Sequence, residues 1–244
     1  MAVCNRRRLV FGSLAGLGVT LTPRVDRWLG APATAAKADG PYDIAAGAPG
    51  CSRVALMINV GSGFDPAMGM FDTLNQYGVD ATVFAMGWLA EQNPGLLQGI
   101  AAWGHPVGSH GYLPPELTSR SDDDVASDLN SGVAALQWAL GYDPIPWLTP
   151  YASASDDRVR AIADSVGLTM VGWSVSSDDW DPGATANSIY NNAVGGAYDG
   201  AIIELHLDSE RSVDGTAVAL PWILDDLSSQ GYQFVTVPQI AGGC

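Results

Sequence analysis

Few side chains in this sequence are suited to acid–base or metal chemistry. The chain has three histidines and 26 acidic residues among 244. His206 directly follows a short apolar run, and an imidazole beside a carboxylate can transfer protons near neutral pH. His110 follows another apolar run and is the second candidate, as a cation ligand or as a hydrogen-bonded structural residue. Carboxylates near the ends of such runs could complete either kind of site: Asp65, Asp178, Asp179, Glu204 and Asp208.

These residues lie in an alternation of strand-like and helix-like segments. Between the strands, apolar residues recur at helical spacing, and Ser121 with Asp124 resembles a capping box at the start of one helix. Seven alternations predict parallel strands and a barrel-like α/β domain, with its chemistry on the loops after the strand carboxyl ends. The expected strands are Val54–Ile58, Ala81–Ala85, Pro106–Ser109, Ile145–Thr149, Thr169–Trp173, Ala201–Leu205 and Gln233–Val237.

Short motifs spread from about Arg53 to Val237 resemble those of the polysaccharide deacetylase (NodB-like) family. The resemblance implies a single domain, an α/β fold of the distorted (β/α)7-barrel type, and deacetylation of sugars with zinc or another divalent cation. The segments that carry it are Val54–Gly61, Gly104–Pro115, Leu148–Ala152, Ser176–Trp180 and Leu205–Asp208.

The first two motifs indicate that the family's metal site is degenerate. Where the family has T-F-D-D-G, with a general base and then a metal ligand, this chain has Asn59 and Val60. An amide takes no proton from water near neutral pH, and an isopropyl group binds no cation. Gly104–His110 resembles G-H-E-I-G-N-H, so His110 stands at the first ligand histidine, but Pro114 replaces the second. One of three implied ligands survives, and we therefore expect no cofactor.

The next two motifs have lost a supporting ion pair. Leu148–Ala152 resembles R-P-P-Y-G but has Leu148 in place of the arginine that holds the base. Ser176–Trp180 resembles D-S-x-D-W, and Ser176 replaces the carboxylate that pairs with that arginine. Loss of both partners avoids an unpaired buried charge, which costs about 3–5 kcal/mol. The last motif keeps His206, which the resemblance implies as general acid.

We therefore expect a polysaccharide-deacetylase-like domain without metal-dependent deacetylase activity. Its partner would be an extracellular or cell-wall polysaccharide, bound in the old substrate groove by Tyr112, Tyr151, Trp180 and Trp88. Two alternatives stay open. The chain could be an active amidohydrolase on N-acetylated polysaccharide with a rearranged site, or a surface protein that uses the barrel only as a scaffold.

The N-terminal residues predict a secreted or cell-surface protein. We divide the chain into an export signal with linker at 1–36, a lead-in at 37–50 and the barrel at 51–244. Arg6–Arg8 precede an apolar run, and Ala33–Ala35 offers a small-x-small cleavage site, as in twin-arginine signals. An uncleaved segment would be the only membrane contact. After residue 35, 6 basic and 25 acidic residues give a formal charge of −19, which argues against nucleic acid as a partner.

Cysteine usage fits export. Apart from Cys4 in the signal, the chain has only Cys51 and Cys244. Two cysteines in an exported protein predict a disulfide, which here would close nearly the whole domain.

Overall fold

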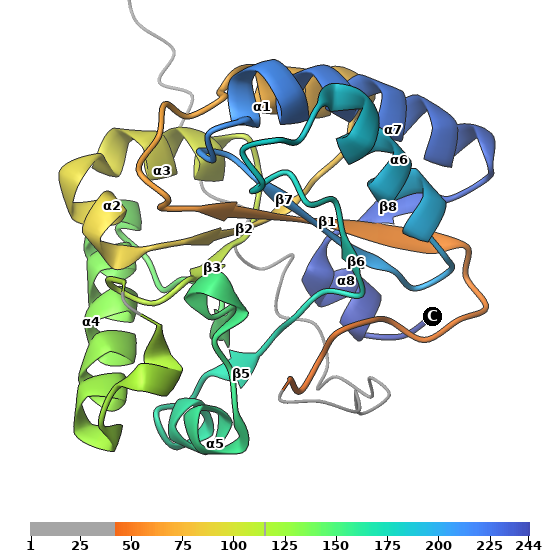
Figure 1. Cartoon of the computed structure of the whole chain (residues 1–244). Coiled ribbons are helices and arrows are strands. Elements are labelled where there is room, and N and C mark those ends of the chain that lie inside the picture. Colours follow the sequence, from red (N-terminus) through yellow and green to blue (C-terminus); the bar gives the residue numbers. More distant parts are fainter. Residues whose placement is uncertain (1–41, 115) are drawn as a thin grey trace, which may run out of the picture.

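A parallel sheet curled into a half-barrel, with helices packed around it, makes up the fold in the computed structural model (Figure 1). The structure describes residues 42–114 and 116–244, so the predicted export signal lies outside the described residues. The predicted single α/β domain of distorted barrel type is confirmed. In the described part of the chain, no helix combines the length and the apolar character needed to cross a membrane.

The strands follow the order β5-β4-β3-β2-β1-β7-β6, and β8 pairs with the first half of β1. All of these pairings are parallel. The bounds are β1 (Arg53–Val60), β2 (Thr82–Ala85), β3 (Val107–Ser109), β4 (Trp147–Leu148), β5 (Thr169–Met170), β6 (Val175–Ser176), β7 (Ile202–His206) and β8 (Gln233–Val235).

The expected strand Thr169–Trp173 is only two residues long in the structure, as β5, and a strand that was not expected, β6, follows it. β5 ends at Met170 beside β4, and β6 begins at Val175 beside β7, at the opposite edge of the sheet. The chain leaves one edge and joins the other, so the residues between cannot stay in one ladder. The segment that begins at residue 42 lies across this opening, where Ile44 pairs with Val171 and Ala46 with Ala201.

Helices cover the outer face of the sheet, and α1, α6 and α7 lie side by side along one part of it (Figure 1). Ser121 caps α4 as expected, since its hydroxyl oxygen accepts the N–H of Asp124 at 3.3 Å. The bounds are α1 (Gly69–Tyr77), α2 (Gly87–Gln92), α3 (Pro94–Ala102), α4 (Asp122–Leu140), α5 (Asp157–Ser165), α6 (Ala186–Gly196), α7 (Ala217–Ser229) and α8 (Val237–Ala241). Short helical turns occupy Leu117–Ser119 (η2), Tyr151–Ser153 (η3) and Ser212–Thr216 (η4).

Strand β1 forms the centre of the core. Its alternate residues pack on the two faces of the sheet, as the twofold period of a strand requires. Leu56, Ile58 and Val60 belong to the hydrophobic layer under the helices, whereas Ala55 and Met57 face the barrel interior. All five are buried, and because both faces of the strand are covered, its sequence is a continuous apolar run.

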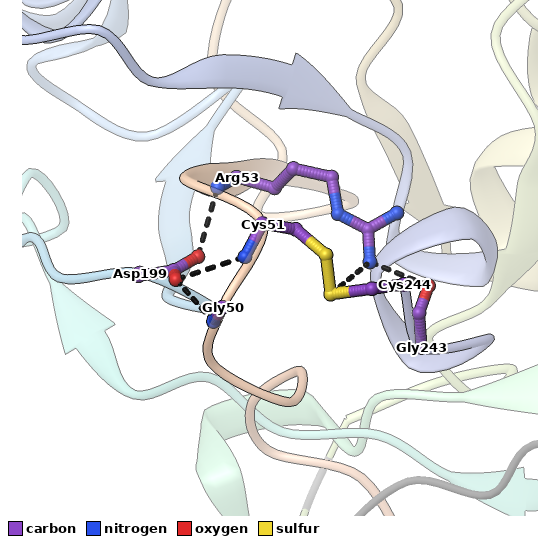
Figure 2. The surroundings of a disulfide bond; sticks show 6 residues. All are labelled: Gly50, Cys51, Arg53, Asp199, Gly243 and Cys244. Atoms are coloured by element: carbon purple, nitrogen blue, oxygen red, sulfur yellow. Dashed lines mark hydrogen bonds between the residues drawn. A yellow bond between two sulfur atoms is a disulfide. The ribbon is translucent and has the colours of Figure 1, made fainter.

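The start of β1 is tied to the C-terminus by a disulfide between Cys51 and Cys244, the pair that the sequence predicts (Figure 2). Their Cα atoms lie 6.0 Å apart and 193 residues separate them. The Arg53 guanidinium donates to the carbonyl of Gly243 at 2.5 Å. The Asp199 carboxylate accepts the backbone N–H groups of Gly50, Cys51 and Arg53, and these hydrogen bonds lower the pKa of Asp199. The disulfide therefore holds the C-terminus against the start of β1.

Candidate functional site

The carboxyl ends of β1 and β7 place three polar side chains on the inner face of the barrel. The register pairs Asn59 with His206 and Met57 with Glu204. Asn59 continues the alternation that turns Ala55 and Met57 inward, and Glu204 and His206 continue that of Ile202. A polar cluster therefore replaces the hydrophobic interior at the barrel mouth.

Asn59 and Glu204 are hydrogen-bonded to each other. The Asn59 Nδ2 donates to Glu204 Oε1 at 2.9 Å, and both residues are almost completely buried. Burial raises the pKa of Glu204 to about 7; the His206 charge opposes this rise, and nearby Asp179 adds to it. Asn59 Oδ1 is buried without a hydrogen-bond partner. Position 59, where the resemblance implies the family's base, thus holds a neutral amide that donates to a carboxyl with a pKa near neutrality.

His206 is held by Asp179. Its Nδ1 lies 2.7 Å from Asp179 Oδ1, and its backbone N–H donates to the other oxygen at 2.8 Å. Thr216 Oγ1 donates to the same carboxylate at 2.8 Å. Burial alone would lower the pKa of His206, but Asp179, with help from Glu204 and Asp208, outweighs it and raises the pKa to about 9. The imidazole is therefore protonated at neutral pH, and its Nε2 lies 3.8 Å from Glu204 Oε1.

His110 differs from His206 in charge. Its Nδ1 donates to the carbonyl of Thr149 at 2.6 Å, and its ring meets Tyr151 edge-on at 5.9 Å. Burial lowers the pKa of His110 to about 4, and the nearby His206 also lowers it. A neutral imidazole that donates from Nδ1 has Nε2 as an acceptor. His110 therefore offers one nitrogen to a cation or to a hydrogen-bond donor.

The remaining side chains do not fit the family's cation. Val60 is 1% exposed and packs in the hydrophobic layer between sheet and helices. Both oxygens of Asp208 accept backbone N–H groups from the loop of Gly61, Ser62 and Gly63, at 3.0–3.1 Å. Pro114 is exposed. Across 42–114 and 116–244, no three His, Cys, Asp or Glu residues form a group that could hold a metal ion.

The two positions at which the resemblance implies an ion pair hold neutral side chains. Leu148 is fully buried in a hydrophobic cluster with Leu129, Val159 and Met170. The Ser176 hydroxyl donates to Asp178 Oδ1 at 2.7 Å. The cluster at Leu148 consists of apolar side chains, and a charged group there would lose its hydration without a partner.

The four aromatic candidates have different environments. Trp180 is 57% exposed and lies in the turn that follows β6. The Tyr112 hydroxyl donates to Glu91 at 2.9 Å, and its backbone N–H donates to Asp128. Tyr151 is partly buried against His110, and Trp88 has a buried Nε1 without a hydrogen-bond partner. Trp180 therefore offers the most accessible ring for stacking.

The sequence motifs missed two residues of the site. Thr216, in η4, holds the carboxylate that orients His206. Tyr42 lies in the segment across the barrel opening, and its hydroxyl is hydrogen-bonded to Ser153 Oγ at 2.7 Å. Burial raises the pKa of Tyr42, and the charge of the nearby Glu204 raises it further. Neither residue belongs to a strand or a motif. His105 has no place in the site, because its Nδ1 accepts the Ala81 N–H and its ring packs on Phe71.

Comparison with known proteins identifies the fold and its relatives. The profile described as polysaccharide deacetylase matches residues 46–171, just over half of the chain. The chain belongs to the polysaccharide deacetylase family. This confirms the family that the motifs indicated.

The chain matches a different share of the length of each curated relative. The peptidoglycan-N-acetylglucosamine deacetylase PgdA of Listeria monocytogenes is 34% identical over 190 residues, which cover 78% of this chain and 39% of that protein. A peptidoglycan-N-acetylglucosamine deacetylase of Bacillus cereus is 32% identical over 191 residues, which cover 76% of this chain and 87% of the relative. The chain thus spans about two fifths of the Listeria relative and most of the Bacillus one.

Solved structures agree with the fold. The Bc1960 peptidoglycan N-acetylglucosamine deacetylase superposes with a TM-score of 0.77 at 28% identity, over 84% of this chain and 94% of that one. BA3943 of Bacillus anthracis, described as a CE4 family pseudoenzyme, gives a TM-score of 0.74 at 24% identity, over 81% of this chain and 68% of that one. At that identity the second match shows a shared fold only.

Proposed function

We propose that this polysaccharide deacetylase-family domain is exported, and that it binds N-acetylated cell-wall polysaccharide without metal-dependent deacetylation. The packing of Val60 carries the proposal. In the family this position holds a metal-ligating carboxylate, and here its side chain is committed to the hydrophobic layer under the helices. With Pro114 at the second ligand histidine, His110 alone remains to hold a cation, and one neutral imidazole is a poor site.

The polar groups that remain suit binding of an intact amide. The protonated His206 carries a hydrogen on Nε2, which can donate to an acetamido carbonyl at the barrel mouth. Its orientation is fixed by Asp179 at Nδ1. The exposed ring of Trp180 offers a face for a sugar, because aromatic residues stack on the apolar face of pyranose rings. The names of the Listeria and Bacillus relatives, which refer to N-acetylglucosamine in peptidoglycan, support this choice of ligand.

The test measures binding and acetate release in the same sample. Full-length protein is incubated with insoluble N-acetylated peptidoglycan, with added zinc and with a chelator. We expect the protein to sediment with the polymer and to release no acetate above the blank in either condition. Trp180→Ala should weaken sedimentation at least fivefold. Trp138→Ala is the matched control, because this ring on α4 is 64% exposed and lies outside the motif loops. Zinc-dependent acetate release, or no binding at all, would refute the proposal.

One observation favours the alternative of a rearranged active amidohydrolase. Glu204 lies 2.9 Å from the side chain at the position of the lost base, and its pKa of about 7 suits a general base. Acetate release that persists with the chelator and disappears in Glu204→Gln would support this second function over the first.

A further inference from the structure

A groove on the outer surface, away from the barrel mouth, has the features of a second ligand site. Its lining residues come from α6 and α7, two helices on the outer face of the sheet (Figure 1), and the groove is shallow and open, with a volume of about 610 Å³. None of its residues belongs to the site described above. The groove is lined by Asn187, Tyr190, Trp222, Asp225, Asp226 and Ser229.

Two carboxylates in the groove are held in fixed orientations. The Tyr77 hydroxyl, from α1, donates to Asp225 Oδ1 at 2.8 Å. The Tyr190 hydroxyl donates to Asp226 Oδ2, and the Gln230 amide donates to Asp226 Oδ1 at 3.1 Å. These hydrogen bonds, that of Tyr190 above all, lower the pKa of Asp226. Adjacent side chains on α7 therefore present oriented negative charge to the groove.

No positive side chain in the described part of the chain forms an ion pair with Asp225 or Asp226. The ion pairs there involve other acids, such as Asp214 with Arg211. The whole chain has a formal charge of −15, so the surroundings add to the negative potential and do not neutralise it. The groove thus complements a cationic group.

An aromatic surface adjoins the carboxylates. Trp222 is 41% exposed, and its ring meets Tyr190 edge-on, with the ring centres 6.3 Å apart and the planes at 80°. A tryptophan face can stack on the apolar face of a sugar ring and attracts a cation above it. Asn187, exposed on α6, adds an amide that can donate to or accept from hydroxyl groups.

We propose that this groove binds glycans with free amino groups, that is, de-N-acetylated hexosamine units. The ammonium group lies against Asp225 and Asp226, and the sugar ring stacks on Trp222. An N-acetylated unit has no positive charge for the carboxylates, and an acidic polymer is repelled. The choice of a glycan over other cations rests on the proposed function. The chain would then bind partly deacetylated polysaccharide at two sites: N-acetylated units at the barrel mouth and units with free amino groups in the groove.

The experiment titrates full-length protein with two probes, a fully de-N-acetylated glucosamine hexamer and the N-acetylglucosamine hexamer. Calorimetry is run at pH 6, where the amines are protonated. We expect the glucosamine hexamer to bind at least tenfold more weakly to Trp222→Ala and to Asp225→Asn. The asparagine keeps an acceptor for Tyr77, so the groove should stay intact. Trp138→Ala, which removes an exposed tryptophan on α4 outside the groove, should bind like the unmodified protein.

Three outcomes would overturn the proposal. The first is glucosamine binding that falls with salt but is unchanged in Trp222→Ala, which would mean attraction to the acidic surface at large. The second is equal dependence of both hexamers on Trp222, which would mean a neutral sugar site. The third is hexalysine that competes at equal affinity with the same dependence on Trp222. Absence of N-acetylglucosamine binding anywhere would refute the proposed function alone, because the glucosamine titration is read separately.

Discussion

Replacement of Glu204 by glutamine should make the protein more stable at alkaline pH and leave it unchanged in acid. Glu204 is 3% exposed, and burial raises its pKa from 4.5 to about 7. A carboxyl that is harder to ionise in the folded state lowers the stability of the fold progressively once the pH exceeds its pKa in the unfolded chain. Glutamine keeps an oxygen for Asn59 Nδ2, so the charge is the main change.

The magnitude follows from the two pKa values. Below pH 4.5 the carboxyl is protonated in both states and contributes no pH dependence. Between pH 4.5 and about 7 only the unfolded chain loses the proton, and each pH unit costs about 1.4 kcal/mol of stability, or roughly 3 kcal/mol in all. In the variant, the protonated His206 no longer has the Glu204 carboxylate beside it. The loss of this attraction cancels part of the stabilisation. We therefore expect Glu204→Gln to be stabilised by roughly 1–2 kcal/mol at pH 8.

The pKa of His206, raised to about 9, acts in a separate range. This imidazole is protonated in both states below pH 6.5, and its stabilising contribution is lost as the pH rises through about 9. The range from pH 4.5 to 6.5 therefore reports Glu204 alone when the variant is compared with the unmodified protein, since other carboxylates cancel in the difference.

Urea denaturation at half-unit steps from pH 4 to 9, with the disulfide intact, measures this difference. The control is Glu210→Gln, because that carboxyl is exposed and glutamine should change stability there by less than about 0.5 kcal/mol at every pH. Parallel curves for the Glu204 variant and the unmodified protein would refute the reasoning. So would a variant that becomes relatively less stable between pH 4.5 and 6.5.

Four further outcomes are expected. In calorimetry, zinc should bind the purified protein with a dissociation constant no lower than millimolar. The triple variant Asn59→Asp, Val60→Asp and Pro114→His should regain zinc binding but little deacetylase activity. Leu148 and Ser176 remain in it, so the restored base lacks the arginine–aspartate pair that would support it. Cys51→Ser should lower the free energy of unfolding by up to roughly 5 kcal/mol in urea, because the bond closes a loop of nearly the whole domain; no change would contradict this. Ala152→Gly should raise the free energy of unfolding by about 0.5–1 kcal/mol, and with it the melting temperature, because Ala152 has a φ of 53° that favours glycine. A lower melting temperature would contradict this.

The sequence predicted most of the sheet because its central strands, β1, β2, β3 and β7, are buried on both faces. The apolar run at Val54–Ile58 is the centre of β1, and Ala201–Leu205 overlaps β7 almost completely. The early end of β5 at Met170 and the separate strand β6 at Val175–Ser176 were not predicted. They result from the crossing of the chain from one edge of the sheet to the other, and local composition does not encode that crossing.

For the site, the motifs located the loops but not the contacts between them. Asn59, His110 and His206 were identified individually, and Glu204 only as a carboxylate near a strand end. The hydrogen bond between Asn59 and Glu204 joins residues 145 apart and depends on the register of β1 against β7. That register is set by the packing of both strands, so the bond and the raised pKa of Glu204 required the structure.

Asn59 and Glu204 form a buried hydrogen-bonded pair at the barrel mouth. Asn59 donates to Glu204, which an aspartate at position 59 could not do while ionised. Two carboxylates so close in a buried site would have to share a proton. Restoration of the family's base at position 59 alone would therefore oppose Glu204, and the neutral Leu148 would offer it no arginine. The amide at Asn59 and the carboxyl at Glu204 depend on each other, which favours a mouth that holds an intact ligand over one that has only lost its catalyst.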